Sequence, residues 1–119
     1  MGESERFSIS DAAAGDEATV VSVAGEIDME TGPSFQRGLL RAIGAGRGGL
    51  VVDLSQASFL DSIALTSLVN AFDQLRRKGG SLAIVASDGR MRALFDVARL
   101  DRDFEIYETR ADALHAVSV

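Results

Sequence analysis

Residues 51–69 of this chain read VVDLSQASFLDSIALTSLV, and this stretch decides the fold. It opens within a short apolar run, residues 50–54, which is typical of a buried strand. Turn-forming residues occupy positions 55–58. Apolar residues then recur at helical spacing, at Leu65, Leu68, Val69, Phe72 and Leu75. The stretch therefore predicts a strand, a turn and a helix that packs one apolar face on a sheet.

The start of that helix combines a carboxylate with a hydroxyl. Asp61 and Ser62 stand where a helix leaves backbone N–H groups free, and both side chains accept such hydrogen bonds, so capping alone explains them. The face that begins with these two residues is predicted to be exposed, and it continues through Ile63, Thr66 and Asn70. In the functional interpretation, the solvent-facing hydroxyl of Ser62 is the centre of function.

The size of the chain indicates one domain. Its 119 residues, 46% of them hydrophobic, are enough for one compact core and too few for two, so residues 1–119 are predicted to form a single domain. The sequence has no run of about 18 apolar residues, and its first six residues lack the basic and apolar segments of an export signal. We therefore expect a cytoplasmic protein with no membrane insertion.

The composition excludes several kinds of chemistry. The chain has no cysteine and a single histidine, His115, which leaves no disulfide, no thiolate metal site and no histidine cluster for zinc. We predict no cofactor or metal, and we expect His115 to lie on the surface of the last helix. The net charge of -6, from 12 basic and 18 acidic residues, repels phosphate backbones. The expected partner is a protein, without direct nucleic-acid binding.

The first part of the chain predicts a hairpin followed by a helix. Residues 7–10 and 19–24 are predicted antiparallel strands joined by a small-residue turn at 11–18. Thr31 is a predicted helix cap, and Pro33 is tolerated in the first turn because the N–H that it lacks would have no partner there. The inward face of this helix carries Phe35, Gly38, Leu39, Ala42 and Ile43.

A glycine-rich segment, residues 44–49, satisfies the G-x-G-x-x-G spacing of a dinucleotide-binding loop. A helix is predicted before it and a strand after it, which is the reverse of what that loop requires. We interpret the segment as a helix end and a loop.

The second half of the chain continues the alternation of strands and helices. Residues 82–86 form an apolar run, as expected for a strand covered on both faces in a parallel sheet. Ser87 or Asp88 is the predicted cap of a third helix, whose inward face carries Met91, Leu94, Phe95 and Ala98. Residues 104–107 predict a last strand, and residues 109–112 resemble a capping box that opens a terminal helix. This order predicts an α/β fold with a mainly parallel sheet.

Three motifs resemble STAS-domain anti-sigma factor antagonists. FLDSIAL at residues 59–65 resembles the family signature, in which an aromatic and an apolar residue precede Asp-Ser. GEID at 25–28 matches the family's Gly-Glu-apolar-Asp after the second strand, and RALFDVARL at 92–100 resembles its third helix. The order and the spacings also agree, and the resemblance covers nearly the whole chain. It implies a STAS-like domain with a mixed, mainly parallel sheet of about five strands and about four helices.

The resemblance implies a partner switch. The unphosphorylated protein would bind an anti-sigma factor that is also a serine kinase, which frees a sigma factor, and phosphorylation would release it. By position, Ser62 would be the phosphate acceptor, Asp61 its cap and neighbour, and Asp28 the acidic residue of the adjoining loop. Ile63, Thr66 and Asn70 would complete the partner-binding surface. ATP and magnesium would belong to the kinase and a serine phosphatase would reset the switch, so the chain itself would be no enzyme.

Two residues of the signature depart from the family pattern. Ile63 stands where the family has a small or hydroxyl residue, and Ala64 replaces its glycine. The alternative interpretation is a STAS subunit that is never phosphorylated and docks in another assembly, such as a lipid-transport complex. A hydrolase using Ser62 is disfavoured because no G-x-S-x-G elbow surrounds this serine and His115 is the only imidazole base.

Overall fold

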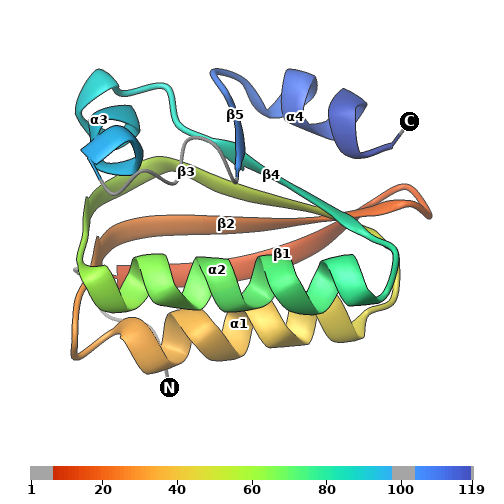
Figure 1. Ribbon diagram of the computed structural model, residues 1–119, viewed down its shortest axis with the longest axis horizontal. Coiled ribbons are helices and arrows are strands. Elements are labelled where there is room, and N and C mark those ends of the chain that lie inside the picture. The colour runs from red at the N-terminus through yellow and green to blue at the C-terminus, as the bar shows by residue number, and fades with distance from the viewer. Residues whose placement is uncertain (1–6, 98–103, 119) are drawn as a thin grey trace.

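Five strands and four helices alternate along the computed structural model, which describes residues 7–97 and 104–118 (Figure 1). In chain order the elements are β1 (Phe7–Ala14), β2 (Ala18–Ile27), α1 (Gly32–Gly44), β3 (Gly49–Leu60), α2 (Ser62–Arg77), β4 (Ser81–Val85), α3 (Gly89–Val97), β5 (Glu105–Tyr107) and α4 (Arg110–Val117). The strands lie in the order β1-β2-β3-β4-β5. β1 is antiparallel to β2 and the other neighbours are parallel, which confirms the predicted mixed, mainly parallel sheet.

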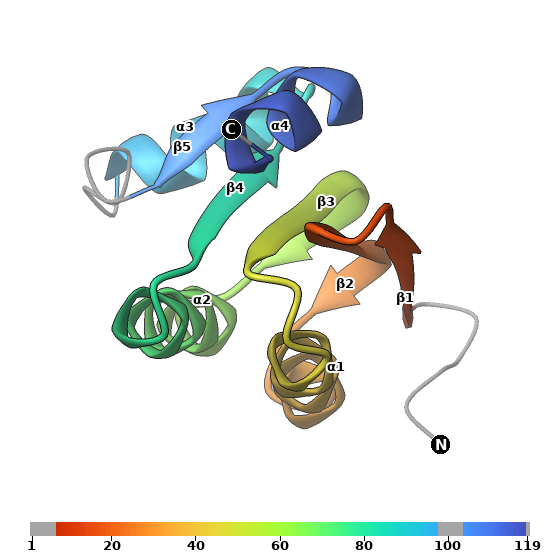
Figure 2. The same cartoon turned by 90° about the vertical axis from the view of Figure 1, so that its right-hand side faces the viewer.

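Helices cover both faces of this sheet. Figure 2 shows α1 and α2 side by side beneath one face, and α3 and α4 on the other side. The residues of β4 alternate between the two hydrophobic clusters: Leu82 and Ile84 belong to the larger one with α1 and α2, and Ala83 and Val85 to the smaller one with α4. Burial of both faces of β4 explains why the apolar run at residues 82–86 is uninterrupted, and it confirms the prediction of a strand covered on both sides.

The N-terminal hairpin is confirmed, with longer strands than predicted. β1 continues to Ala14, and Ala12, Ala13 and Ala14 pair with the first residues of β2. The predicted turn at 11–18 therefore shrinks to residues 15–17, where Gly15 adopts a positive φ of 70°. The small residues 12–14 favour a turn locally, but they pair with β2 because that strand supplies hydrogen-bond partners for their backbone groups.

The predicted turn at residues 55–58 is wrong, because β3 runs on to Leu60. This segment pairs in parallel with the end of β2, through to the Ile27–Leu60 pair. The ladder contains two register shifts, and the second leaves Ser58 unpaired between Ala57 and Phe59. Pairing with β2 thus overrides the local turn preference of the serines and leaves a bulge.

The predicted inward faces of α1 and α2 are confirmed. All five predicted inward residues of α1 are buried, and the apolar face of α2 packs into the same cluster. In α3, Met91 and Phe95 are buried, Leu94 is half-buried, and Ala98 lies outside the described residues. None of the described helices is long and apolar enough to cross a membrane.

Among the three helix caps predicted for α1, α3 and α4, two have the expected partners. Thr109 accepts a hydrogen bond from the Asp112 N–H at 3.1 Å, as the capping box requires. Asp88, rather than Ser87, accepts one from the Arg90 N–H at 2.9 Å. The predicted capping bond of Thr31 is wrong: Thr31 precedes α1, but its side chain makes no capping bond and instead serves the loop before the helix.

Candidate functional site

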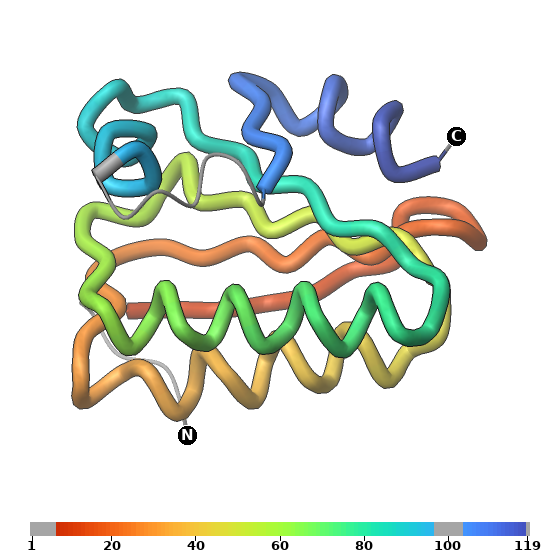
Figure 3. The backbone as a smooth tube through the Cα atoms, in the orientation of Figure 1, coloured from red at the N-terminus to blue at the C-terminus, as the bar shows by residue number. Residues whose placement is uncertain are grey.

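The residues predicted to matter gather at the edge of the sheet where β2 and β3 end. The loop from β2 to α1 and the start of α2 lie side by side there, at the left of Figures 1 and 3. The backbone N–H of Asp61 donates to the Ile27 carbonyl at 3.0 Å, which ties the start of α2 to the end of β2. Asp61 is extended, with φ -97° and ψ -178°, so α2 begins at Ser62.

Asp61 and Ser62 have different roles at this helix start. The Asp61 Oδ1 atom accepts a hydrogen bond from the Ala64 N–H at 3.0 Å and so caps α2. Ser62 is exposed, and its hydroxyl has no hydrogen-bond partner among residues 7–97 and 104–118. Capping therefore explains the carboxylate and leaves the hydroxyl unexplained.

The face of α2 that begins at Ser62 is exposed, as its periodicity predicts. Ile63 is 44% exposed, and Thr66 and Asn70 extend the exposed face one and two turns along the helix. The Thr66 hydroxyl donates to the Ser62 carbonyl at 2.9 Å, so it is already engaged within the helix. Ala64 is fully buried, and its methyl group belongs to the core rather than to this surface.

Asp28 organises the loop between β2 and α1. Its Oδ1 atom accepts hydrogen bonds from the backbone N–H groups of Glu30 at 2.9 Å and Thr31 at 3.1 Å. Thr31 completes the loop, because its hydroxyl accepts from the Asp28 N–H and donates to the Glu26 carbonyl. The structure places Asp28 at the same edge as Ser62, with its carboxylate shaping the loop from within.

Two exposed apolar residues at this edge were not predicted as site residues. Met29 is 75% exposed in the loop after β2, and Phe59 is 45% exposed near the end of β3. The aromatic position of the FLDSIAL motif was the only sequence signal for Phe59. Its exposure depends on the bulge at Ser58, which no pattern of apolar residues reveals, and Met29 carries no motif at all.

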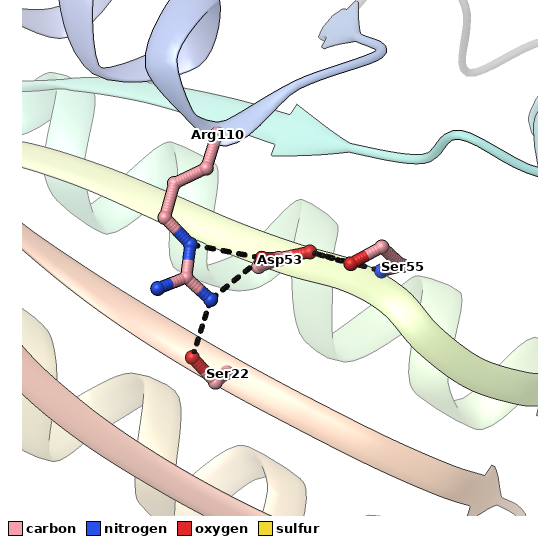
Figure 4. A network of polar contacts seen from close by, with 4 residues as sticks. All are labelled: Ser22, Asp53, Ser55 and Arg110. Atoms are coloured by element: carbon pink, nitrogen blue, oxygen red, sulfur yellow. Dashed lines mark hydrogen bonds and ion pairs between the residues drawn. The ribbon is translucent and has the colours of Figure 1, made fainter.

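A second polar cluster lies on the other side of the sheet (Figure 4). Arg110, the first residue of α4, donates to Asp53 Oδ2 through Nε at 3.0 Å and Nη2 at 2.7 Å, and through Nη2 to the Ser22 hydroxyl at 3.0 Å. Asp53 Oδ1 accepts from the N–H and hydroxyl of Ser55. The cluster fastens α4 to β2 and β3 beside an open hollow of about 230 Å³.

The charge of Asp53 is stabilised by these partners. Burial by itself raises the pKa of this carboxyl, but the hydrogen bonds from Ser55 and the guanidinium of Arg110 outweigh it and hold the pKa below the usual value. Asp53 is therefore ionised at neutral pH, and its charge is matched by that of Arg110.

The arrangement around Ser62 does not resemble a hydrolytic site. His115 lies exposed on α4, across the sheet from α2 (Figure 2), so it cannot act as the base for Ser62. Within the part of the chain that the structure describes, no three histidine, aspartate or glutamate side chains are grouped to hold a metal ion.

Comparison with known proteins gives the family. The family model described as "STAS domain" matches residues 10–113. The chain belongs to the STAS domain family. Among curated relatives of this STAS domain, the "Anti-sigma-B factor antagonist" of Listeria monocytogenes is 33% identical over 88 residues, which cover 72% of this chain and 75% of that protein. The "Anti-sigma-F factor antagonist RsfB" of Mycobacterium tuberculosis is 29% identical over 98 residues, covering 82% of this chain and 80% of that one.

Solved structures agree with the fold. The crystal structure of an anti-sigma factor antagonist from Mycobacterium paratuberculosis superposes with a TM-score of 0.86 at 32% identity, covering 93% of both chains. The phosphorylated form of SpoIIAA from Bacillus superposes with a TM-score of 0.70 at 19% identity, covering 92% of this chain and 99% of SpoIIAA, and shares the fold. The predicted STAS-like architecture is confirmed.

Proposed function

We propose that this STAS domain is an anti-sigma factor antagonist that is switched by phosphorylation of Ser62. The unphosphorylated form binds an anti-sigma factor that is also a serine kinase, and a sigma factor is thereby freed. Transfer of phosphate to Ser62 releases the antagonist, and a serine phosphatase restores it. The names of the relatives support the regulatory role. In this proposal the chain acts in the cytoplasm and is no enzyme, because the kinase supplies ATP and magnesium.

One observation carries the proposal: the Ser62 hydroxyl is exposed and unengaged while Asp61 caps the helix. A kinase can therefore modify Ser62 without removing a hydrogen bond from the described fold. Thr66, the other exposed hydroxyl on this face, donates to the Ser62 carbonyl and would have to give up that bond. The local chemistry favours Ser62 over Thr66 as the acceptor.

The position of Ser62 explains how a phosphate acts on binding rather than on folding. Phosphoserine carries roughly -1.5 to -2 charges at neutral pH. At the N-terminus of α2 that charge meets free N–H groups and the positive end of the helix dipole, which favour an anion by about 0.3 to 1 kcal/mol. Asp61 repels the phosphate and offsets part of this gain. A partner that buries the same surface faces an unpaired charge, which costs several kcal/mol.

The test uses the purified anti-sigma factor kinases encoded in the same genome. Each is incubated with the chain, ATP and magnesium, and the phosphorylated residue is mapped by mass spectrometry. We expect phosphate on Ser62, none on Ser62→Ala, and normal incorporation on Thr66→Ala as the matched control. Ser62→Ala is expected to keep the fold and kinase binding, because Asp61 still caps α2. Continued phosphate incorporation by Ser62→Ala would overturn the assignment.

A further inference from the structure

We infer that three exposed apolar side chains around Ser62, those of Met29, Phe59 and Ile63, anchor the anti-sigma factor kinase and select which kinase binds. We call these three residues the apolar rim. The inference rests on the proposed function and deepens it by assigning the chemistry of the contact: the kinase presents an apolar recess, and the rim fills it.

The apolar rim is a local concentration of exposed hydrophobic side chains. Four large hydrophobic residues are exposed in the described part of the chain, and three of them are the rim, at 75% for Met29, 45% for Phe59 and 44% for Ile63. They come from three segments: the loop after β2, the end of β3 and the first turn of α2. Single exposed hydrophobic residues are common on protein surfaces, whereas a group of them marks a contact surface.

The backbone brings the three segments of the rim together. Leu60, next to Phe59, pairs with Ile27, two residues before Met29. The N–H of Asp61 donates to the Ile27 carbonyl at 3.0 Å, and Ile63 follows in the first helical turn. The three residues therefore lie at the end of the sheet at which Ser62 stands.

The bulge in β3 is what exposes Phe59. Ala57 and Leu60 are both buried in the main core, and the unpaired Ser58 between Ala57 and Phe59 shifts the alternation of faces. In a regular strand Phe59 would share the face of Ala57 and point into the core, while Leu60 would point outward. The bulge reverses both, which buries Leu60 and exposes the aromatic ring of Phe59 to solvent.

Ile63 is supported from below by α1. Its Cγ2 atom lies 3.3 Å from the position that a Cβ atom on Gly32 would occupy, so it packs against the first residue of α1. The rest of the side chain remains exposed. The Ile63 side chain therefore packs against α1 on one side and is accessible to solvent on the other, and its position depends on Gly32.

The location of the rim also explains why a phosphate on Ser62 would abolish binding of the kinase. Interface hot spots are well-packed apolar or aromatic side chains from which water is excluded. A doubly charged group on Ser62 would lie at the same end of the sheet as the three residues and would keep water at the contact. The rim supplies the affinity of the unmodified form, and its position beside Ser62 makes that affinity sensitive to phosphate.

Leu40 provides a matched control for the test. It is the fourth exposed large hydrophobic residue, at 40%, and it lies in α1 eight residues beyond Gly32, about 12 Å along the helix. The experiment measures binding of the kinase identified in the phosphorylation test to Met29→Ala, Phe59→Ala, Ile63→Ala and Leu40→Ala by calorimetry. Thermal melts of each variant verify the fold, since all four side chains are exposed to 40% or more.

We expect each rim variant to lose about tenfold or more in affinity, while Leu40→Ala binds like the unmodified sequence. Rim variants that bind as tightly as Leu40→Ala would overturn the inference and leave the proposed function standing. A chain that neither binds nor accepts phosphate from any of the kinases would instead overturn the proposed function. For selection between kinases, Ile63→Ser is expected to change the ratio of affinities across the set, and an unchanged ratio would contradict that part.

Discussion

The carboxylate of Asp61 accepts a hydrogen bond from the backbone N–H of Ala64 at 3.0 Å, and the hydroxyl of Ser62 takes no part in this cap. Asp61→Ala removes the cap and is expected to lower the free energy of unfolding by about 1 kcal/mol. Ser62→Ala removes a hydroxyl with no partner in the described structure and should change it by less than about 0.5 kcal/mol. Urea denaturation of both variants measures the difference. Equal losses would mean that Ser62 is a structural residue.

Asp28 should affect stability as well as partner binding. Its Oδ1 atom accepts hydrogen bonds from the N–H groups of Glu30 and Thr31. Asp28→Ala is therefore expected to lower the free energy of unfolding by about 1 to 2 kcal/mol. It should also weaken kinase binding, because it loosens the loop that carries Met29. Asp28→Asn retains an oxygen acceptor and should recover most of the stability. Denaturation and calorimetry on the two variants separate the roles. An alanine variant with unchanged stability and unchanged affinity would show that this loop does not matter.

The Asp53–Arg110 ion pair predicts a pH dependence of stability. The pKa of Asp53 is lowered in the folded state below the ordinary value of an aspartate, so its charge stabilises the fold above that ordinary value. The contribution disappears as the pH falls through the lower, folded-state pKa. Asp53→Asn should therefore lower the free energy of unfolding by about 1 to 2 kcal/mol at neutral pH, a figure discounted for the half-exposed Arg110, and by less once the pH falls below the ordinary pKa of an aspartate.

Urea denaturation of wild type and Asp53→Asn across this range measures that prediction. The difference in free energy of unfolding between the two proteins should stay constant from neutral pH down to the ordinary pKa of an aspartate and should narrow as the pH falls further. A gap that stays constant from about pH 7 to about pH 3 would show that the charge of Asp53 does not contribute.

Gly32 offers a test of how Ile63 is held. An added methyl group in Gly32→Ala would lie 3.3 Å from Ile63 Cγ2, so the half-exposed isoleucine must shift by a few tenths of an ångström. We expect a change in stability within about 1 kcal/mol and weaker kinase binding, although every rim side chain is retained. Nuclear magnetic resonance shifts of the Ile63 methyl groups report the displacement. Shifted methyl resonances with unchanged affinity would show that the position of Ile63 is not important.

Periodicity predicted the fold well wherever packing and pattern agree. The apolar faces of α1 and α2 and the doubly buried β4 follow directly from spacing, because burial of one face or of both faces leaves a distinct pattern. The end of β3 was mispredicted because its serines favour a turn locally, while pairing with β2 holds them in a strand. That pairing is a tertiary effect, and no window of sequence contains it.

The sequence predicted the residues at the start of α2, but it did not predict the exposed Phe59 or the ion pair on the other side of the sheet. The Asp61–Ser62 pair at a helix start and the exposed Ile63 follow from the local pattern and from the resemblance to the family. Phe59 turns outward only because of the bulge at Ser58. Arg110 and Asp53 are separated by 57 residues, so their ion pair becomes visible only when α4 is placed over the sheet.

The central claim is that phosphate on Ser62 ends binding without disturbing the fold. The most direct measurement compares the unmodified and Ser62-phosphorylated chains, first by thermal melting and then by calorimetric titration with the anti-sigma factor kinase. We predict melting temperatures within a few degrees of each other, equivalent to about 1 kcal/mol, and an affinity lower by orders of magnitude for the phosphorylated form. Equal affinities of the two forms would contradict the switch and favour a STAS subunit that docks constitutively.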